Sequence, residues 1–256
     1  MKVEMSIRDR HKVILELIET KGHVEVAELS RLNGVSDATV RRDLEILERE
    51  GLVKRIHGGA ISKVSLSHEP AYNVRAQRMI GEKIRIGRKA ASLISEGETI
   101  VLDVGTTTTE VARALKDQRN ITVFTPSLWV ANILADEPGI VVMVSGGIVR
   151  RGERSLVGDF AERAFNELVF DTFIMGIAGI HTEYGLTEYN LQDSQTKRSA
   201  IKATRRTIVV ADGSKLGKIA FAKICHLNDV DALITDNGSP NELEQLYSTD
   251  IEIIIA

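Results

Sequence analysis

Several residue types are scarce in this chain of 256 residues, and each scarcity argues against a class of structure or function. Cys225 is the only cysteine, so no disulfide can form within one chain and no cysteine-based metal site is visible. The six histidines show no HxxxH spacing, and we expect no bound metal. Aromatic residues make up 4% of the chain, which disfavours base stacking on single-stranded nucleic acid. No apolar run reaches 18 residues, so we expect no membrane contact.

The start of the chain is charged and unlike a secretory signal, which predicts a cytoplasmic protein. The length favours two domains. The net charge of −3 conceals an asymmetry, because residues 1–91 hold 18 basic against 13 acidic residues and residues 92–256 hold 15 against 23. A basic front part fits a nucleic-acid partner at one end. The first 60 residues alone balance at 11 against 11, so the placement of the positive charges matters more than their number.

Three short helices are expected near the start of the chain. Apolar residues recur at helical spacing over residues 6–20 and 24–32, and Gly34 allows a turn before a third helix. Ser36 is the expected N-cap of this third helix, which runs to about residue 48. Its apolar stripe, at i, i+4 and i+7, consists of Val40, Leu44 and Leu47.

The other face at the start of the third helix is polar and basic. Its residues are Ser36, Asp37, Thr39, Arg41 and Arg42. Two helices joined at a glycine turn, with the second basic near its start, are typical of a helix-turn-helix DNA reader. In the major groove an arginine can bind a guanine edge, and a serine or threonine can contact a base or a phosphate. The alternative for adjacent arginines is a solvated helix face, but the preceding helix and the cap favour DNA contact.

A β-hairpin is expected after Gly51, because LVKRIHGGAI alternates in polarity and ends in a Gly-Gly turn. The basic residues of this wing can reach the DNA backbone or the minor groove, although His57 could simply be a polar hairpin residue. Residues 1–61 are therefore predicted to form a winged helix-turn-helix domain that binds double-stranded DNA. The predicted DNA-binding residues are Ser36, Thr39, Arg41, Arg42, Lys54, Arg55 and His57.

Residues 62–78 are polar, contain one proline and show no clear period until their end, which predicts a linker between domains. Six basic residues lie in and after this segment: Arg75, Arg78, Lys83, Arg85, Arg88 and Lys89. They could form a solvated helix face, or they could contribute to DNA backbone contact or to an anionic pocket.

An α/β domain with a mostly parallel sheet is expected over residues 79–256, because short runs rich in Ile and Val alternate there with helical segments. Such sheets bind ligands at the carboxyl ends of their strands. The strongest sign of a site is DVGTTTTE, residues 103–110, where a strand ends and a helix begins. Gly105 permits close approach of the backbone, and the threonines place hydroxyls beside free N–H groups that favour a phosphate or carboxylate. The alternative is an ordinary threonine-capped helix.

Further candidates follow other strands at the same edge. The complete set of predicted ligand-binding residues is Asp103, Gly105, Thr106, Thr107, Thr108, Ser127, Gly146, Gly147, Lys197, Asp212 and Lys215. The two adjacent glycines could open room for a ligand or merely form a turn. A lysine and an aspartate at this edge can bind a phosphate and sugar hydroxyls, respectively, although a lone lysine is usually solvated. No GxxxxGK[ST] motif is present, so ATP hydrolysis is not supported.

The segment VSDATVRRDLEILEREGLVKRIHGGA resembles the signature of the DeoR family of bacterial transcription regulators. The later segments resemble that family's sensor domain, which is similar in fold to ribose-5-phosphate isomerase. The resemblance implies a repressor that is released from DNA by a phosphorylated sugar or related metabolite. Because two-fold proteins read palindromic half-sites, we expect a homo-oligomer such as a dimer or tetramer, and we expect no cofactor. Two segments depart from the family pattern and leave the effector open: Thr125-Pro126-Ser127 replaces a Thr-Asn, and residues 192–196 are less acidic than usual.

A second hypothesis is a sugar-phosphate isomerase with an accessory N-terminal domain. Such an enzyme needs a carboxylate base beside the substrate carbon, for which Asp103 and Asp212 are candidates. An isomerase has no use for a capped basic helix followed by a basic wing. The sequence therefore favours a regulator without catalytic residues.

Overall fold

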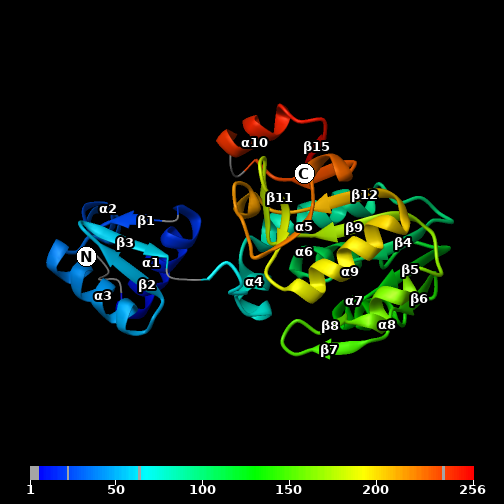
Figure 1. The fold of residues 1–256 in the computed structure, drawn as a ribbon, viewed down its shortest axis with the longest axis horizontal. Coiled ribbons are helices and arrows are strands. Elements are labelled where there is room, and N and C mark those ends of the chain that lie inside the picture. Colours follow the sequence, from blue (N-terminus) through cyan, green and yellow to red (C-terminus); the bar gives the residue numbers. More distant parts are fainter. Residues whose placement is uncertain (1–5, 22, 63–64, 238–239) are drawn as a thin grey trace. The chain divides into compact units, whose positions relative to one another are not determined.

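The computed structural model describes residues 6–21, 23–62, 65–237 and 240–256, and the chain divides into two compact units, Met1–Ser65 and Leu66–Ala256. The elements of the first unit are α1 (Ile7–Lys21), β1 (His23–Glu25), α2 (Val26–Asn33), α3 (Asp37–Arg49), β2 (Val53–Ile56) and β3 (Gly59–Ser62). The elements of the second unit, shown with the first in Figure 1, are α4 (Tyr72–Gln77), α5 (Ile80–Ala91), β4 (Thr99–Leu102), α6 (Thr106–Leu115), β5 (Ile121–Thr125), α7 (Leu128–Leu134), β6 (Ile140–Val144), β7 (Ile148–Arg150), β8 (Ser155–Val157), α8 (Asp159–Ala164), β9 (Phe170–Gly176), β10 (Gly179–His181), β11 (Gly185–Glu188), α9 (Leu191–Lys202), β12 (Thr204–Val210), the 3-10 turns η1 (Gly213–Lys215) and η2 (Leu227–Asp229), β13 (Ala222–Cys225), β14 (Ala232–Thr235), α10 (Pro240–Tyr247) and β15 (Glu252–Ile255).

The first unit packs its three helices against an antiparallel sheet of order β1-β3-β2. Its core is apolar and consists of Ile14, Ile18, Val24, Val26, Leu29, Val40, Leu44, Leu47, Val53 and Ala60. The stripe predicted for the third helix is thus confirmed as the buried face of α3. The prediction that the second helix begins at Val24 is wrong, because residues 23–25 form β1 and pair with β3.

The wing hairpin turns at His57 and Gly58, so the predicted Gly-Gly turn is wrong by one residue. Ile56 pairs with Gly59 across this turn, and Gly58 has a φ of 82°. Gly59 belongs to β3 and lies so close to β1 that a Cβ atom there would be 2.0 Å from the carbonyl oxygen of Val24. Strand packing, rather than the turn, therefore requires the second glycine.

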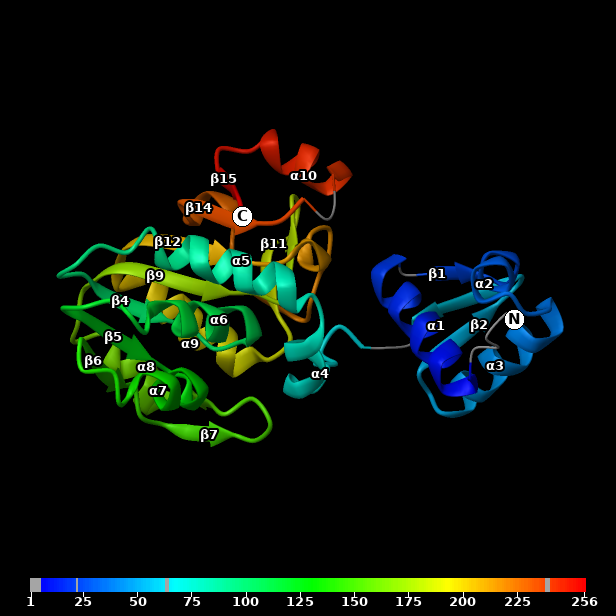
Figure 2. The ribbon, with the colours of Figure 1, turned by 180° about the vertical axis from the view of Figure 1, so that it is seen from behind.

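The second unit is built on a seven-stranded parallel sheet of order β15-β14-β12-β9-β4-β5-β6. Helices α5, α6 and α7 cover one face, and α8 and α9 cover the other (Figures 1 and 2). The chain runs outward from β4 to β6, returns to β9 beside β4, and then runs outward the other way. The strand order therefore reverses between β4 and β9, and this is the place where open α/β sheets bind ligands. The predicted mixed architecture, an α/β domain with a helix-turn-helix domain before it, is confirmed.

The second unit begins earlier than the predicted boundary at residue 79. Leu66 already belongs to it, and its carbonyl oxygen accepts a hydrogen bond of 3.0 Å from the N–H of Phe221. Within the segment predicted as linker, Tyr72 starts α4, bonds Thr109 across 2.7 Å and stacks on Trp129 with 4.9 Å between ring centres. These contacts hold most of that segment on the second unit. No helix among the described residues is long and apolar enough to cross a membrane.

Candidate functional sites

The first candidate site is the exposed face at the start of α3. Ser36 caps the helix, because its Oγ accepts the N–H of Thr39 at 3.2 Å and lies 2.9 Å from the Oγ1 of that residue. Arg41 and Arg42 are exposed, and the side chain of neither has a hydrogen bond or ion pair to another residue in the described part of the chain. Two uncommitted guanidinium groups thus stand on the turns of a capped helix that can enter a major groove.

A buried ion pair fixes α3 to α1. Arg10 bonds both carboxylate oxygens of Asp43, at 2.8 and 3.1 Å, and both residues are buried. The Nε2 of His11 lies 3.4 Å from the same carboxylate. Asp43 directly follows the two arginines and would repel a phosphate if it were exposed. The pair removes that charge from the surface and sets how α3 is presented.

The three predicted DNA-binding residues of the wing have two kinds of surroundings in the structure. Arg55 is tied to α3, since its Nη1 lies 2.9 Å from the Oε1 of Glu45 and its N–H donates to Glu48 at 2.8 Å. Lys54 and His57 are exposed. Arg55 is also exposed, but its guanidinium pairs with α3, whereas Lys54 and His57 are exposed without such a tie to that helix.

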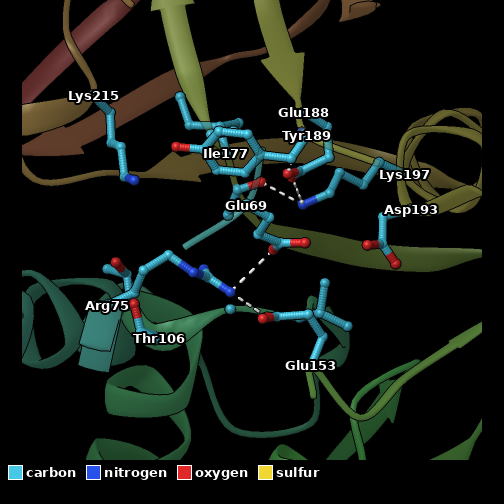
Figure 3. Close-up of a pocket in the computed structure, with 15 residues that line it drawn as sticks. Glu69, Arg75, Thr106, Glu153, Ile177, Glu188, Tyr189, Asp193, Lys197 and Lys215 are labelled. Carbon is cyan, nitrogen blue, oxygen red and sulfur yellow. Dashed lines mark hydrogen bonds and ion pairs between the residues drawn. The ribbon is translucent and has the colours of Figure 1, made fainter. Parts of the chain in front are cut away.

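The second candidate site is a pocket at the carboxyl ends of β4 and β9, where the strand order reverses (Figure 3). Its lining residues are Glu69, Arg75, Val104, Gly105, Thr106, Thr107, Glu153, Gly176, Ile177, Ala178, Glu188, Tyr189, Asp193, Lys197 and Lys215. The first turn of α6 faces this pocket, and the N–H groups of such a turn are not used within the helix. They and the helix dipole provide positive potential for an anion.

A buried lysine organises one side of the pocket. The Nζ of Lys197 lies 2.6 Å from the Oδ2 of Asp103, 3.0 Å from the Oε2 of Glu188 and 2.6 Å from the carbonyl oxygen of Gly176. Burial alone would lower the pKa of Lys197, but the two carboxylates outweigh it and raise that pKa. Burial raises the pKa of Asp103 to about 6, against the opposing effect of the lysine. Burial also opposes ionisation of Glu188, but Lys197 and a backbone N–H lower its pKa.

Two arginines hold the acidic residues of the pocket, and of these two Arg75 is the one that lines it. Arg75 of α4 bonds Glu69 at 3.0 Å and also bonds Glu153. Arg150 of β7 bonds the other oxygen of Glu69 at 2.9 Å and pairs with Asp193 at 2.5 Å. Burial raises the pKa of Glu69 to about 7, although Arg75 works against that shift. Glu69 thus joins two guanidinium groups that come from different elements.

The predicted ligand-binding residues separate into three groups. Gly105, Thr106, Thr107, Lys197 and Lys215 line the pocket. Asp103 and Asp212 are each 1% exposed; the former holds Lys197, and the latter accepts the N–H of Ser214 at 3.1 Å. These two aspartates therefore support the pocket wall rather than line it.

The remaining predicted residues lie outside the lining. Thr108 is fully buried and bonds the carbonyl oxygen of Gly105 at 3.0 Å, because its side chain turns back onto the helix start. Ser127 is fully buried and caps α7. Gly146 and Gly147 are exposed in a turn, and their positive φ angles of 74° and 112° explain the residue type without a ligand.

Sequence reasoning missed the acidic half of the pocket. The residues concerned are Glu69, Glu153, Glu188 and Asp193, together with Tyr189. They follow no local motif and come from an expected linker, a hairpin turn, a short strand and the start of a helix. Arg75 was considered for an anionic pocket as one of six basic residues, but nothing in the sequence distinguished it from the other five.

Two family descriptions match this chain. The DeoR-like helix-turn-helix domain matches residues 10–65, and the DeoR C-terminal sensor domain matches residues 78–237. A basic reading helix and a sensor domain on one chain define a transcription regulator. The chain belongs to the DeoR family of transcriptional regulators, which confirms the family expected from the sequence.

Relatives match over almost the whole length. The transcriptional regulator GolR of Listeria innocua is 35% identical over 229 residues, which cover 90% of both proteins. The glycerol-3-phosphate regulon repressor of Escherichia coli strain K12 is 34% identical and covers 95% of this chain and 96% of its own. The regulator GlpR of Haloferax volcanii is 33% identical over 96% of both. These proteins are named as regulators or repressors, so the expectation that this chain is not an enzyme is confirmed.

Solved structures are less similar. The sorbitol operon regulator SorC of Klebsiella pneumoniae aligns over 94% of this chain and 98% of its own, with a TM-score of 0.42 and 12% identity. A ribose 5-phosphate isomerase of Methanocaldococcus jannaschii aligns over 54% of each chain, with a TM-score of 0.41 and 14% identity.

Proposed function

We propose that this protein represses genes for the use of a sugar or polyol, and that a phosphorylated metabolite bound in the second unit lowers its affinity for the operator. The observation that carries the proposal is the combination, on one chain, of exposed and uncommitted Arg41 and Arg42 with a polar pocket at the strand-order reversal. The names of the relatives, among them a glycerol-3-phosphate regulon repressor, support this class of effector.

The pocket has groups suited to both ends of such a metabolite. The guanidinium of Arg75 suits a phosphate, and the N–H groups of Thr106 and Thr107 and the ammonium of Lys215 add positive potential in the same pocket. The carboxylates of Glu188 and Asp193 can accept hydrogen bonds from sugar or polyol hydroxyls. A purely apolar or purely acidic ligand would leave half of these groups without partners, which costs free energy in a buried site.

An oligomer would allow two α3 helices to read two half-sites about one helical turn apart. The edge strand β6 and the neighbouring β7 provide a surface suited to such a contact. Their exposed apolar residues are Val141, Met143, Val144, Ile148 and Val149, which are 41% to 69% exposed. An apolar group of this extent at a sheet edge is typical of a subunit contact.

The DNA half of the proposal is tested with a duplex that the protein selects from a random pool. Replacing Arg41 and Arg42 together with alanine should lower affinity at least about thirtyfold, since each arginine that reads a base is worth about 1–3 kcal/mol. Fluorescence anisotropy measures the affinity. Arg119→Ala, an exposed arginine of the second unit, is the control for lost charge. Affinity of the double variant within about twofold of the parent would contradict the assignment of α3.

The effector half is tested with a thermal-shift screen of phosphorylated sugars and polyols. A ligand at a hundred times its Kd should stabilise the protein by about 2.7 kcal/mol. The same ligand should release the parent protein from DNA, whereas Lys215→Met should still bind DNA and should need far more ligand for release. A screen in which only unphosphorylated sugars stabilise the protein would contradict the proposed class of effector.

A further inference from the structure

The pocket is filled from within by Glu69. Its two carboxylate oxygens contact the Nη2 atoms of Arg75 and Arg150 at 3.0 and 2.9 Å, and its side chain is 15% exposed. A carboxylate that bridges two guanidinium groups has the geometry with which proteins hold carboxylate and phosphate ligands. In Figure 3 this carboxylate lies between Arg75 and the Lys197–Glu188 pair, in the middle of the lining residues.

The space that remains is too small for a metabolite. The cavity measures about 30 Å³, enough for one or two water molecules, whereas ligand pockets usually measure about 300–1,000 Å³. A sugar phosphate therefore cannot enter while Glu69 occupies its place. Some part of the lining must leave before an effector can bind.

The ion pairs and the local secondary structure indicate that Glu69 is the part of the lining that leaves. Among the described ion pairs, Glu69, Glu153 and Asp193 share the two guanidinium groups of Arg75 and Arg150, so these three carboxylates outnumber the two arginines that pair with them. Asp193 lies in the first turn of α9, and Glu153 lies in the turn of the β7–β8 hairpin. Glu69 lies on residues 66–71, which form no helix or strand; we call this segment the strap. Of the three acidic residues, Glu69 is therefore the one that lies neither in a helix nor in the turn of a hairpin.

We propose that Glu69 occupies the position of the effector's anionic group on Arg75 and Arg150, so that an entering phosphate or carboxylate expels the strap. This inference rests on the proposed function of the pocket as the effector site. The strap starts at Leu66, directly after Ser65, where the DNA-binding unit ends. Expulsion of the strap therefore lengthens the connection between the two units.

The lengthening supplies a physical route to DNA release. Six freed residues add up to about 20 Å of reach to the connection. In an oligomer on two half-sites, the second DNA-binding unit binds at an effective concentration that falls as its tether grows beyond the span between the half-sites. A longer tether thus weakens binding to the operator without any change in α3.

The proposal is tested with Glu69→Gln, which removes the charge but keeps the shape. The probe is inorganic phosphate at pH 8, measured by titration calorimetry. If Glu69 occupies the site in about nine of ten molecules, its neutralisation should tighten phosphate binding about tenfold. Hydrogen exchange of the amides of residues 66–71 should be faster in this variant without phosphate, and should rise in the parent protein when phosphate is added. Glu96→Gln, an exposed glutamate outside the pocket, is the control.

The outcomes separate this inference from the proposed function. The inference is overturned if the parent binds phosphate and Glu69→Gln binds it no more tightly. It is also overturned if phosphate binds and the amides of the strap stay protected from exchange. In either case the pocket remains an anion site. Failure of both proteins to bind phosphate and glycerol 3-phosphate overturns the inference and the proposed effector class together. If Glu69→Gln does not fold, Glu69→Asp provides the same measurement, because the shorter side chain cannot bridge both arginines.

Discussion

The ammonium group of Lys197 lies 2.6 Å from the carboxylate of Asp103, and each residue is only 1% exposed. Glu188 completes the group at 3.0 Å. Because Lys197→Met would leave two buried carboxylates without their cation, we expect a loss of about 3–5 kcal/mol in the free energy of unfolding. Denaturant unfolding measures this loss. Lys202→Met removes an exposed lysine from the same helix and should cost little; equal stability of the two variants would contradict the role of Lys197.

Gly59→Ala should disrupt the first unit alone. Its Cβ would lie 2.0 Å from the carbonyl oxygen of Val24, so the β1–β3 pair must separate, at a cost of about 3 kcal/mol or more. Gly58→Ala meets no atom within 4 Å and should cost about 1–2 kcal/mol through its positive φ alone. Calorimetry should show a clearly larger fall in the first unit's transition temperature for Gly59→Ala than for Gly58→Ala. A single unchanged transition in Gly59→Ala would refute this packing.

Phosphate binding should depend on the ionisation of Glu69. The groups that face it are Arg75, Arg150, Glu153 and Glu188, and burial raises its pKa from 4.5 to about 7. As the pH rises through 7, the carboxylate gains its charge and competes more strongly for the arginines. The ratio of phosphate Kd in the parent to that in Glu69→Gln should therefore rise from near one below pH 6 to about tenfold above pH 8.

The titration of phosphate itself cancels in this ratio, because both proteins receive the same ligand. The pH dependence of the protein's stability provides an independent check on the direction of the pKa shift of Glu69. A folded pKa above the unfolded value means that this group stabilises the protein fully below pH 4.5 and loses that contribution as the pH rises through 7. Glu69→Gln should remove this part of the pH dependence. A ratio that stays constant from pH 5.5 to 8.5 would contradict the prediction.

The exposed apolar surface of β6 and β7 should control assembly. Ile148→Asp places a charge on a side chain that is 69% exposed, and should lower the molar mass measured by light scattering if this surface joins subunits. Affinity for a two-half-site duplex should fall with it, whereas affinity for one half-site should not change. Val169→Asp, at an equally exposed apolar residue, is the control. An unchanged mass would exclude this surface as the subunit contact.

The helix α3 and its exposed face could be predicted because their signals are local. Ser36, Val40, Leu44 and Leu47 specify a capped amphipathic helix within twelve residues, and the arginines occupy the face that remains. The strand-to-helix turn at Gly105 is equally local, and so Thr106 and Thr107 were found. The start of α2 was missed because the strand at Val24 depends on a partner strand more than thirty residues later.

The network of charges in the pocket could not be predicted, because its partners are distant in the chain. Glu69 and Arg150 are 81 residues apart, and Asp103 and Lys197 are 94 residues apart. Chain geometry, not a motif, brings these pairs together at the ends of β4 and β9. The same reason explains why Asp103 was expected to bind ligand, since its buried partner could not be seen from the sequence.

Trp129 gives this molecule an optical reporter of its own. It is the only tryptophan of the chain, its ring stacks on Tyr72 and lies 4.0 Å from the guanidinium of Arg154, and Tyr72 is three residues from Glu69. A shift of the stacked tyrosine would change the surroundings of a single indole. On the proposed expulsion of the strap, we expect its emission to follow occupancy of the pocket in real time, without a dye and without DNA.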